Sequence, residues 1–508
     1  MTSVSPSPVL DTGPPAGPRP EAPLLLDTEP PRPLGFRDQA AFWTNLGVSL
    51  IGFQSAATVL VFNNKDLSVA ASLTAIVLGT VIGALMLGVA AVIGTRTGAP
   101  AMAILRGLFG TRLSYLPTVL NIVQCLGWGV FELTVIAMGA DALFKGGPHW
   151  VYVVLAGALT TLMTIRPLGS IAVLRRYVAI AVGVAMLFFT VELLRRGVPN
   201  PNPGNWTGFL PAVDSVIAVS ISFVPLAADY TRHARTTRSS FWGAFSGYTV
   251  SQVWCYVVGL LALLQVGGDP NKIFTTFMGI TAGWLFFAVL VLRETDQSFA
   301  NVYSTAMSLQ NLFPRVDRRF LSVGLGVLVT GLALQVTDFS GYEAFLGLIG
   351  AVFVPLSAVL AVDFFFGAGK REGDAARSAS DKGGGGRREE DAARSASDKG
   401  GGGRREEGAA RSASDKGGGG RREGGWDLSE GAPTRWLTLL PWAVGFAVYQ
   451  LIAPAALTGW MSFWPTFWAK AQNLTHIHPQ VWTSASLFSF LVPALITWAM
   501  TPLLRRGR

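Results

Sequence analysis

Residues 215–235 read SVIAVSISFVPLAADYTRHAR, and this stretch decides the fold of the chain. It is apolar enough to cross a membrane, but Pro225 lies inside it, shortly after Ser220 and Ser222. A proline removes one backbone hydrogen bond from a helix, and the hydrocarbon of a bilayer holds no water to replace that bond. We therefore expect a membrane-spanning segment that is interrupted near Pro225 and borders a protein-lined cavity, where small polar solutes can bind.

The composition indicates an integral membrane protein. Of the 508 residues, 50% are hydrophobic and 14% are charged, and the mean hydropathy is +0.42. Soluble proteins carry about 25% charged residues. The formal net charge is +9, but the basic residues lie between apolar runs and form no patch interleaved with aromatic residues. We therefore expect the lipid bilayer as a partner and no nucleic acid.

Twelve apolar segments reach the length of about 20 residues that crosses a bilayer, which predicts an all-α integral membrane protein with twelve transmembrane helices. Four alternate loops carry three arginines each, and positive charge collects on the cytoplasmic side. We therefore expect a multi-pass protein of the plasma membrane with both termini in the cytoplasm. The segments are residues 40–62, 68–94, 114–143, 149–167, 172–194, 211–231, 240–266, 279–311, 320–336, 341–367, 436–458 and 482–504.

Two polar regions are expected to be disordered and to divide the chain. The first is a proline-rich cytoplasmic tail, residues 1–35. The second is a cytoplasmic loop, residues 368–430, in which AARSASDKGGGGRRE occurs three times with a period of 17. Glycine runs with mixed charge bury too little apolar area to fold. These regions leave a ten-helix core over residues 36–367 and two further transmembrane helices within residues 431–508.

The sequence contains no HExxH, GxSxG or phosphate-binding glycine-loop motif. These motifs carry the reacting groups of zinc proteases, serine hydrolases and nucleotide-dependent enzymes. We therefore expect no enzyme, no catalytic residue and no cofactor.

The third segment carries a polar stripe. In NIVQCLGWGVFELTVIAMG, residues 121–139, Gln124, Trp128 and Glu132 are four residues apart and share one helix face. An amide, a flat ring and a carboxylate in a row suit the stacking and edge-on hydrogen bonding of a planar heterocycle. Ionisable residues inside a membrane are costly and indicate function. A packing stripe, with Glu132 paired to another segment, is equally compatible with this spacing.

Two further segments are unusually polar. The first segment, FWTNLGVSLIGFQSAATVL at residues 42–60, includes Gln54 and is rich enough in glycine to unwind near Gly52, although small residues also permit close helix packing. The eighth, RETDQSFANVYSTAMSLQN at residues 293–311, offers oxygen ligands for a cation, the alternative being a kink or an interhelical ion pair. If the first ten segments form two repeats of five, the first and sixth correspond, which favours a binding site between inverted repeats.

The order and spacing of four motifs resemble the nucleobase cation symporter-1 family, which includes bacterial cytosine permeases. The motifs are GTRTGAPAMAILRGLFGTRLSYLPTVLN, QCLGWGVFE, SFVPLAADYTRHAR and TDQSFANVYSTAMSLQN, and the likeness runs over about residues 36–366. The resemblance implies a LeuT-like 5+5 inverted repeat, with discontinuous helices one and six, and alternating access. It also implies uptake of a nucleobase or related planar heterocycle, such as cytosine, a purine or a hydroxymethylpyrimidine, driven by sodium or protons as coupling ion.

The resemblance also implies the binding residues. Trp128 matches the tryptophan that stacks on the base, and Gln124 and Glu132 match its polar neighbours. Phe223 matches the aromatic residue of the sixth segment, and Asn301 matches an asparagine that contacts substrate. To this set we add Ser220 and Ser222, which can read the edge of the ring, and Gln54 of the first segment.

Sodium in members of this family is held by backbone carbonyls of the first segment and by hydroxyl side chains of the eighth. Those hydroxyl positions match Thr295 and Asp296. An aspartate departs from the pattern, so sodium and proton coupling both stay open. An amino-acid permease of the same fold, which Glu132 disfavours because a carboxylate repels an anion, and a non-transporting membrane receptor are the alternative functions.

Overall fold

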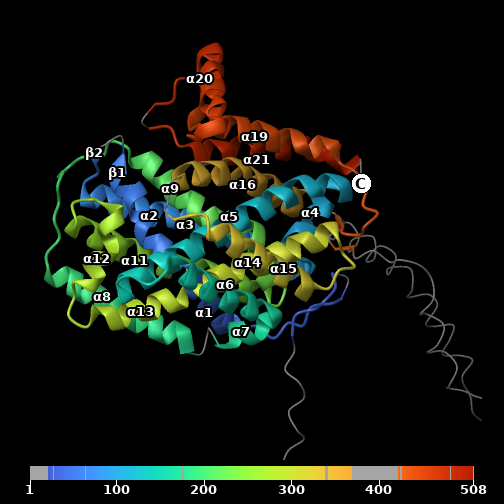
Figure 1. The fold of residues 1–508 in the computed structure, drawn as a ribbon. Helices are drawn as coiled ribbons and strands as arrows, with labels where there is room; N and C mark the ends of the chain where they lie inside the picture. The colour runs from blue at the N-terminus through green and yellow to red at the C-terminus, as the bar shows by residue number, and fades with distance from the viewer. Residues whose placement is uncertain are drawn as a thin grey trace, which may run out of the picture.

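The structure is a computed structural model that describes residues 21–26, 28–62, 65–173, 177–337, 341–368, 422–423, 426–480 and 482–506. Nearly all of these residues form helices that lie side by side in one bundle (Figure 1). The strands of the described part are two short antiparallel pairs, β1 Val61–Phe62 with β2 Lys65–Asp66 and β3 Arg422–Glu423 with β4 Trp426–Asp427. The chain is therefore mostly helical, as the apolar segments predict.

Each of the twelve expected segments contains helix. The first is divided into α1 Phe36–Leu46 and α2 Leu50–Leu60, and the sixth into α9 Phe209–Ile221 and α10 Ala227–Thr231. The other helices up to residue 362 are α3 Val69–Thr97, α4 Ala101–Phe109, α5 Thr111–Phe144, α6 His149–Ile165, α7 Pro167–Val173, α8 Ala179–Arg195, α11 Thr237–Gln265, α12 Ile273–Met278, α13 Gly283–Arg293, α14 Thr295–Leu312, α15 Arg318–Ala333 and α16 Tyr342–Val362. The C-terminal helices are α19 Leu439–Ile452, α20 Phe463–Thr475 and α21 Ala485–Arg506.

Length and hydropathy identify six stretches of the described chain that can each cross a membrane unaided. A seventh arises if α6 and α7, which meet at an angle of 111°, are counted as one broken span. The six are Val69–Thr97, Thr111–Phe144, Phe209–Thr231, Thr237–Gln265, Tyr342–Gly367 and Ala485–Leu504. These lengths support a multi-pass membrane protein, and the count of twelve spans stays a prediction.

The sixth segment changes its helical type around Pro225. A 3₁₀ turn, Val224–Leu226, follows α9 and precedes α10, because proline cannot donate the next hydrogen bond of an α-helix. The carbonyl of Ser222, just before the turn, accepts a hydrogen bond of 3.0 Å from the side-chain amide of Gln124 on α5. A side chain of a neighbouring helix thus replaces the partner that the backbone lacks.

The first segment is interrupted earlier than expected. We expected unwinding near Gly52, but Gly52 lies inside α2, and residues 47–49 separate the two helices. The reason is the contact with α11. A Cβ atom on Gly47 would lie 2.0 Å from Oγ of Ser251, and 3.0 Å from both the backbone N of Gln252 and the carbonyl oxygen of Tyr248. Only glycine permits this close approach to α11 at position 47.

The N-terminal residues hold defined positions, in contrast to the disordered tail that we expected for residues 1–35. Residues 21–35, without Asp27, contact all four arginine-rich loops because their backbone finds hydrogen-bond partners there and Leu34 is buried. Residues 1–20 lie outside the described part. The contacts are Glu21 Oε1 with Leu168 N (2.8 Å), Leu24 O with Arg318 N (3.1 Å), Arg32 Nη1 with Thr95 O (3.0 Å), and Leu34 N with His233 O (3.1 Å).

The expected disordered loop, residues 368–430, and its three repeats lie mostly outside the described residues. Its last part differs from the expectation, because Trp426 is buried. Its ring lies 5.1 Å from that of Phe364 between centroids and fills the space that a side chain at Gly107 would need. The burial of this tryptophan fixes the chain where it enters the C-terminal helices.

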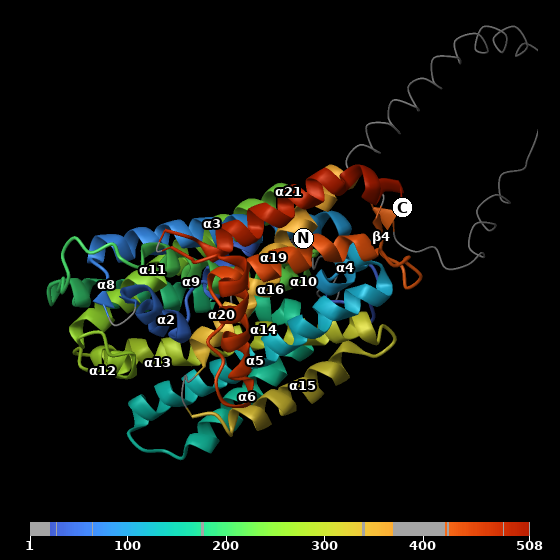
Figure 2. The ribbon, with the colours of Figure 1, turned by 90° about the horizontal axis from the view of Figure 1, so that it is seen from above.

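The C-terminal helices are attached to the side of the bundle. α19 and α21 lie along α16, and α20 projects away from them (Figures 1 and 2). Asp214 on α9 holds the start of α21, because its carboxylate accepts hydrogen bonds from Ser484 Oγ (2.6 Å), Ala485 N (2.8 Å) and Ser486 N (3.1 Å). These bonds satisfy backbone donors that a helix N-terminus leaves free.

Candidate functional site

A cavity lies where the two interrupted segments face α5, α11 and α14. Its walls leave a free volume of about 30 Å³ between them. The break between α1 and α2 forms one wall, and the end of α9 with its 3₁₀ turn forms another. Of the eight predicted binding residues, five line this cavity: Trp128, Glu132, Ser222, Phe223 and Asn301.

The two predicted stacking residues stand in different walls. Trp128 on α5 is held edge-on by Tyr342 and Phe345, with ring centroids 5.9 Å and 5.4 Å away. Phe223, at the end of α9, makes an edge contact with Tyr248, with ring centroids 5.3 Å apart. Edge-to-face contacts are the favoured geometry of aromatic pairs. They fix the orientation of both rings beside the cavity.

On α5, two polar atoms of the cavity wall lack a partner. Within the described part of the chain, Nε1 of Trp128 and Oε2 of Glu132 make no hydrogen bond, although both side chains are buried. Buried polar groups without a partner are costly and rare in native proteins. An indole N–H that can donate and a carboxylate oxygen that can accept are therefore available to a bound molecule.

Three predicted residues do not line the cavity. Gln124 lies behind the wall of the cavity, and its side-chain amide donates a hydrogen bond to the carbonyl of Ser222. The single O–H of Ser220 is shared between the carbonyl of Val216, in its own helix, and Oε1 of Gln252, at 3.1 Å in each case. Gln54 is buried on α2 away from the cavity. For Gln124 and Ser220 the structure thus indicates support of the wall rather than contact with a solute.

A second polar stripe, on α11, is absent from the predicted binding residues. Tyr248, Gln252 and Tyr256 on α11 line the cavity, and they repeat the spacing of four residues seen on α5. Among the described residues, Nε2 of Gln252 and Oη of Tyr256 have no hydrogen-bond partner. The signal was present in the sequence, because polar residues every fourth position inside an apolar segment mark a single helix face.

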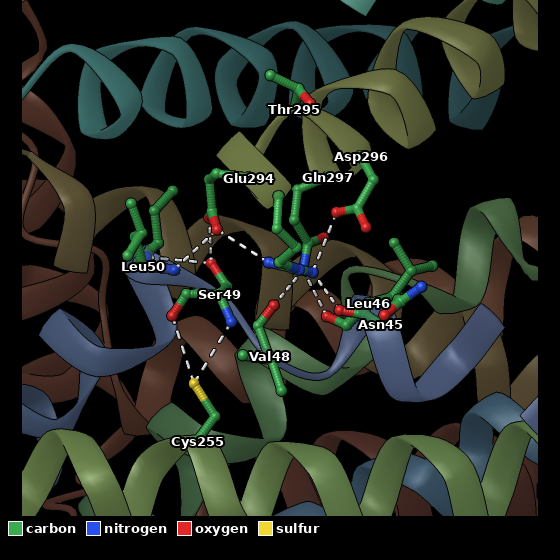
Figure 3. A network of polar contacts seen from close by, with 12 residues as sticks. Asn45, Leu46, Val48, Ser49, Leu50, Cys255, Glu294, Thr295, Asp296 and Gln297 are labelled. Atoms are coloured by element: carbon green, nitrogen blue, oxygen red, sulfur yellow. Dashed lines mark hydrogen bonds and ion pairs between the residues drawn. The ribbon is translucent and has the colours of Figure 1, made fainter. Parts of the chain in front are cut away.

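The two residues expected to hold a cation are not brought together. Oγ1 of Thr295 bonds to the backbone of Leu292 at 2.8 Å, and its side chain points away from the polar network beside it (Figure 3). Asp296 instead pairs with Arg293, with 3.1 Å between Oδ1 and Nη2. In the described part of the chain, no group of three or more histidine, cysteine or acidic side chains is suited to a metal ion.

A cavity with buried polar groups in its wall, placed between interrupted helices of a membrane bundle, is the arrangement of a transporter. Residues 28–384, more than half of the chain, match the family described as permease for cytosine/purines, uracil, thiamine and allantoin. The chain therefore belongs to this family of permeases, the nucleobase cation symporter-1 family, and is a transporter and not an enzyme.

Two relatives in sequence are both described as purine-cytosine permeases. YxlA of Bacillus subtilis, a protein assigned this function, is 27% identical over 325 residues, which cover 58% of this chain and 68% of that protein. The permease FCY2 of Saccharomyces cerevisiae is 21% identical over 332 residues, which cover 58% of this chain and 61% of that protein. The match to the yeast protein thus leaves more than a third of its length uncovered.

The solved structures of Mhp1, a nucleobase-cation-symport-1 family transporter, share the fold. An inward-facing conformation of Mhp1 gives a TM-score of 0.63 at 16% identity and covers 96% of this chain and 94% of that chain. A closed conformation with bromovinylhydantoin bound gives 0.61 at 17% identity, with 94% and 99% covered. The expected LeuT-like, mostly helical fold is confirmed at this level.

Proposed function

We propose that this chain is a secondary active transporter that imports a nucleobase or a related planar heterocycle together with a cation. The observation that carries the proposal is the pair of unpartnered atoms, Nε1 of Trp128 and Oε2 of Glu132, in a cavity that Phe223 also lines. The relatives are described as permeases for purines and cytosine, and Mhp1 binds a hydantoin. These compounds are rings with hydrogen-bond donors and acceptors on their edges.

In this proposal the ring of the substrate lies between Trp128 and Phe223. Aromatic pairs contribute about 0.5–1.5 kcal/mol beyond the burial of their area. Glu132 accepts an N–H of the substrate edge, and Asn301 and Gln252 offer amide groups to the rest of it. A carboxylate in this position favours edges rich in N–H donors, such as those of cytosine or an aminopyrimidine.

The membrane arrangement that we propose has twelve spans, with the first ten in two inverted repeats and both termini in the cytoplasm of a plasma-membrane protein. The contacts of residues 21–35 with all four arginine-rich loops support one common side for these loops and the N-terminus. The C-terminal end lies with α4 at one end of the bundle, opposite the β1–β2 pair (Figures 1 and 2).

Transport in this proposal proceeds by alternating access. The core of residues 36–367 forms two bundles around the cavity, and rocking of one against the other exposes the site to each side in turn. The interrupted segments provide the flexible points, because a few residues at the ends of helices absorb such movements. The pair α19 and α21 lies outside this core.

Uptake of radiolabelled cytosine into vesicles that contain the purified chain tests the proposal. Excess unlabelled purines, uracil, hydroxymethylpyrimidine, allantoin and amino acids serve as competitors. We expect Trp128→Ala to abolish uptake at an unchanged protein level, and Trp436→Ala, at a side chain that is 67% exposed, to leave it intact. Competition by amino acids alone would favour the amino-acid permease. Binding without accumulation would favour the receptor.

A further inference from the structure

Backbone carbonyls at the break between α1 and α2 accept hydrogen bonds from side chains of α13 and α14, and that of Asn45 also accepts one from the backbone N–H of Val48 at 3.3 Å. The guanidinium of Arg293 donates through Nη2 to the carbonyl of Asn45. The amide of Gln297 donates to the carbonyls of Leu46, at 2.6 Å, and Val48, at 3.1 Å. Figure 3 shows these carbonyls gathered around the same polar network. The oxygens that an unwound first segment offers to a cation are thus already engaged by N–H groups.

Two carboxylates complete the surroundings of Arg293. Glu294 lies 2.9 Å from Nη1, and Asp296 lies 3.1 Å from Nη2; the side chains of all three residues are at most 1% exposed. Glu294 also holds the start of α2, since it accepts hydrogen bonds from Oγ of Ser49 at 2.6 Å and the backbone N–H of Leu50 at 2.9 Å. A buried charge requires such pairing, and the planar guanidinium suits several partners at once.

These residues do not fit a sodium ion. A hard cation needs several free oxygen ligands around it. Thr295 faces a separate apolar cavity and donates to the carbonyl of Leu292, while Asp296 pairs with Arg293. A sodium ion at this place would also stand beside the positively charged guanidinium of Arg293.

We propose that the guanidinium of Arg293 takes the place of the coupling sodium and joins the break of the first segment to α13 and α14 as a built-in cation. The consequence is that uptake does not require sodium. Glu132 on α5 lies within electrostatic reach of Arg293, Glu294 and Asp296. The inference rests on the transport function proposed above.

The first test measures initial uptake rates of cytosine by the full chain in vesicles, with sodium chloride replaced by choline chloride at equal ionic strength. We expect the same rate in both media. Uptake that is lost in choline and restored by sodium overturns the inference while supporting the transport function. Absence of uptake in either medium, with every competitor ring tried as substrate, contradicts the transport function instead.

A second test does not depend on transport. We expect sodium chloride and choline chloride to give the purified chain the same melting temperature, and a selective rise in sodium would overturn the inference. Arg293→Ala should lose uptake in both media, and Arg293→Lys should retain more of it, because a lysine keeps the charge. Arg195→Ala, at a side chain that is 71% exposed, is the matched control and should behave as the unaltered chain does. Full uptake by Arg293→Ala in choline would also contradict the inference.

Discussion

The side-chain amide of Gln124 reaches 3.0 Å across from α5 to the carbonyl of Ser222, the residue at which α9 ends. One side chain therefore both bridges two walls of the cavity and satisfies the backbone at the interruption that Pro225 causes.

Replacing Gln124 with leucine tests this bridge. The substitution leaves the carbonyl of Ser222 without its donor, and we expect a loss of roughly 1 kcal/mol, since interhelical hydrogen bonds in membranes contribute about that much. The measurement is the melting temperature in detergent, followed by uptake in vesicles. A Gln124→Leu variant with unchanged stability and unchanged uptake would show that this hydrogen bond contributes to neither.

Glu132→Gln keeps the shape of the side chain but replaces one of its oxygens with an N–H donor. We expect the affinity for cytosine to fall about 10-fold, because a buried polar group that faces a mismatched partner costs about 1–3 kcal/mol. Competition binding on purified protein measures this effect. Glu192→Gln, which alters a carboxylate paired with Arg195 at the end of α8, should leave affinity unchanged. Equal affinities of the two variants would place the substrate away from Glu132.

Gly47→Ala tests the close approach of the first segment to α11 at this position. The added Cβ would lie 2.0 Å from Oγ of Ser251, and the backbone of α11 leaves it no room to move. We expect loss of uptake and a lower melting temperature. Gly183→Ala is the matched control, because no atom lies within 4 Å of a Cβ at that helical position. It should be neutral or slightly stabilising, as alanine favours helix over glycine.

The attachment of the N-terminal residues should weaken in acid. Burial, together with the neighbouring Arg232, lowers the pKa of His233 to about 3. The Nδ1 atom of His233 lies 2.8 Å from the carbonyl oxygen of Pro31, which can only accept, so this ring nitrogen carries the proton. The folded chain thus keeps the ring neutral, while the unfolded chain protonates it below about pH 6.5. The stability is complete above that pH and falls by about 1.4 kcal/mol per pH unit below it.

Melting temperatures between pH 7.5 and pH 5 check this expectation in the unaltered chain and in His233→Asn, whose amide can still donate to Pro31. The variant should have the flatter profile. Parallel profiles for the two proteins would assign the acid sensitivity to other groups.

Local rules predicted the interruption at Pro225 and the placement of Trp128 and Glu132 on one face of a helix. A proline and a spacing of four residues act within one segment, so no knowledge of the neighbours is needed. Gln252 and Tyr256 on α11 have the same spacing. They are a weaker signal of a binding site than a carboxylate, because tyrosine is common in apolar segments.

The polar network at the break could not be predicted in the same way. Arg293 precedes α14 along the chain, and only the packing of α13 and α14 against the first segment brings its guanidinium to the carbonyl of Asn45. The break near Gly47 depends in turn on α11, which is about 200 residues away in sequence. Contacts between distant segments decide both features.

The hydrogen bonds between Asp214 and the start of α21 make α21 a suitable place for a spectroscopic label that follows α9. Because three hydrogen bonds fasten α21 to α9, a displacement of α9 must carry α21 with it. Trp498 stands on α21 with 62% of its surface exposed, far along the chain from every residue of the cavity. A label at this position would report in real time how the sixth segment moves during a transport cycle, without touching the site where the solute binds.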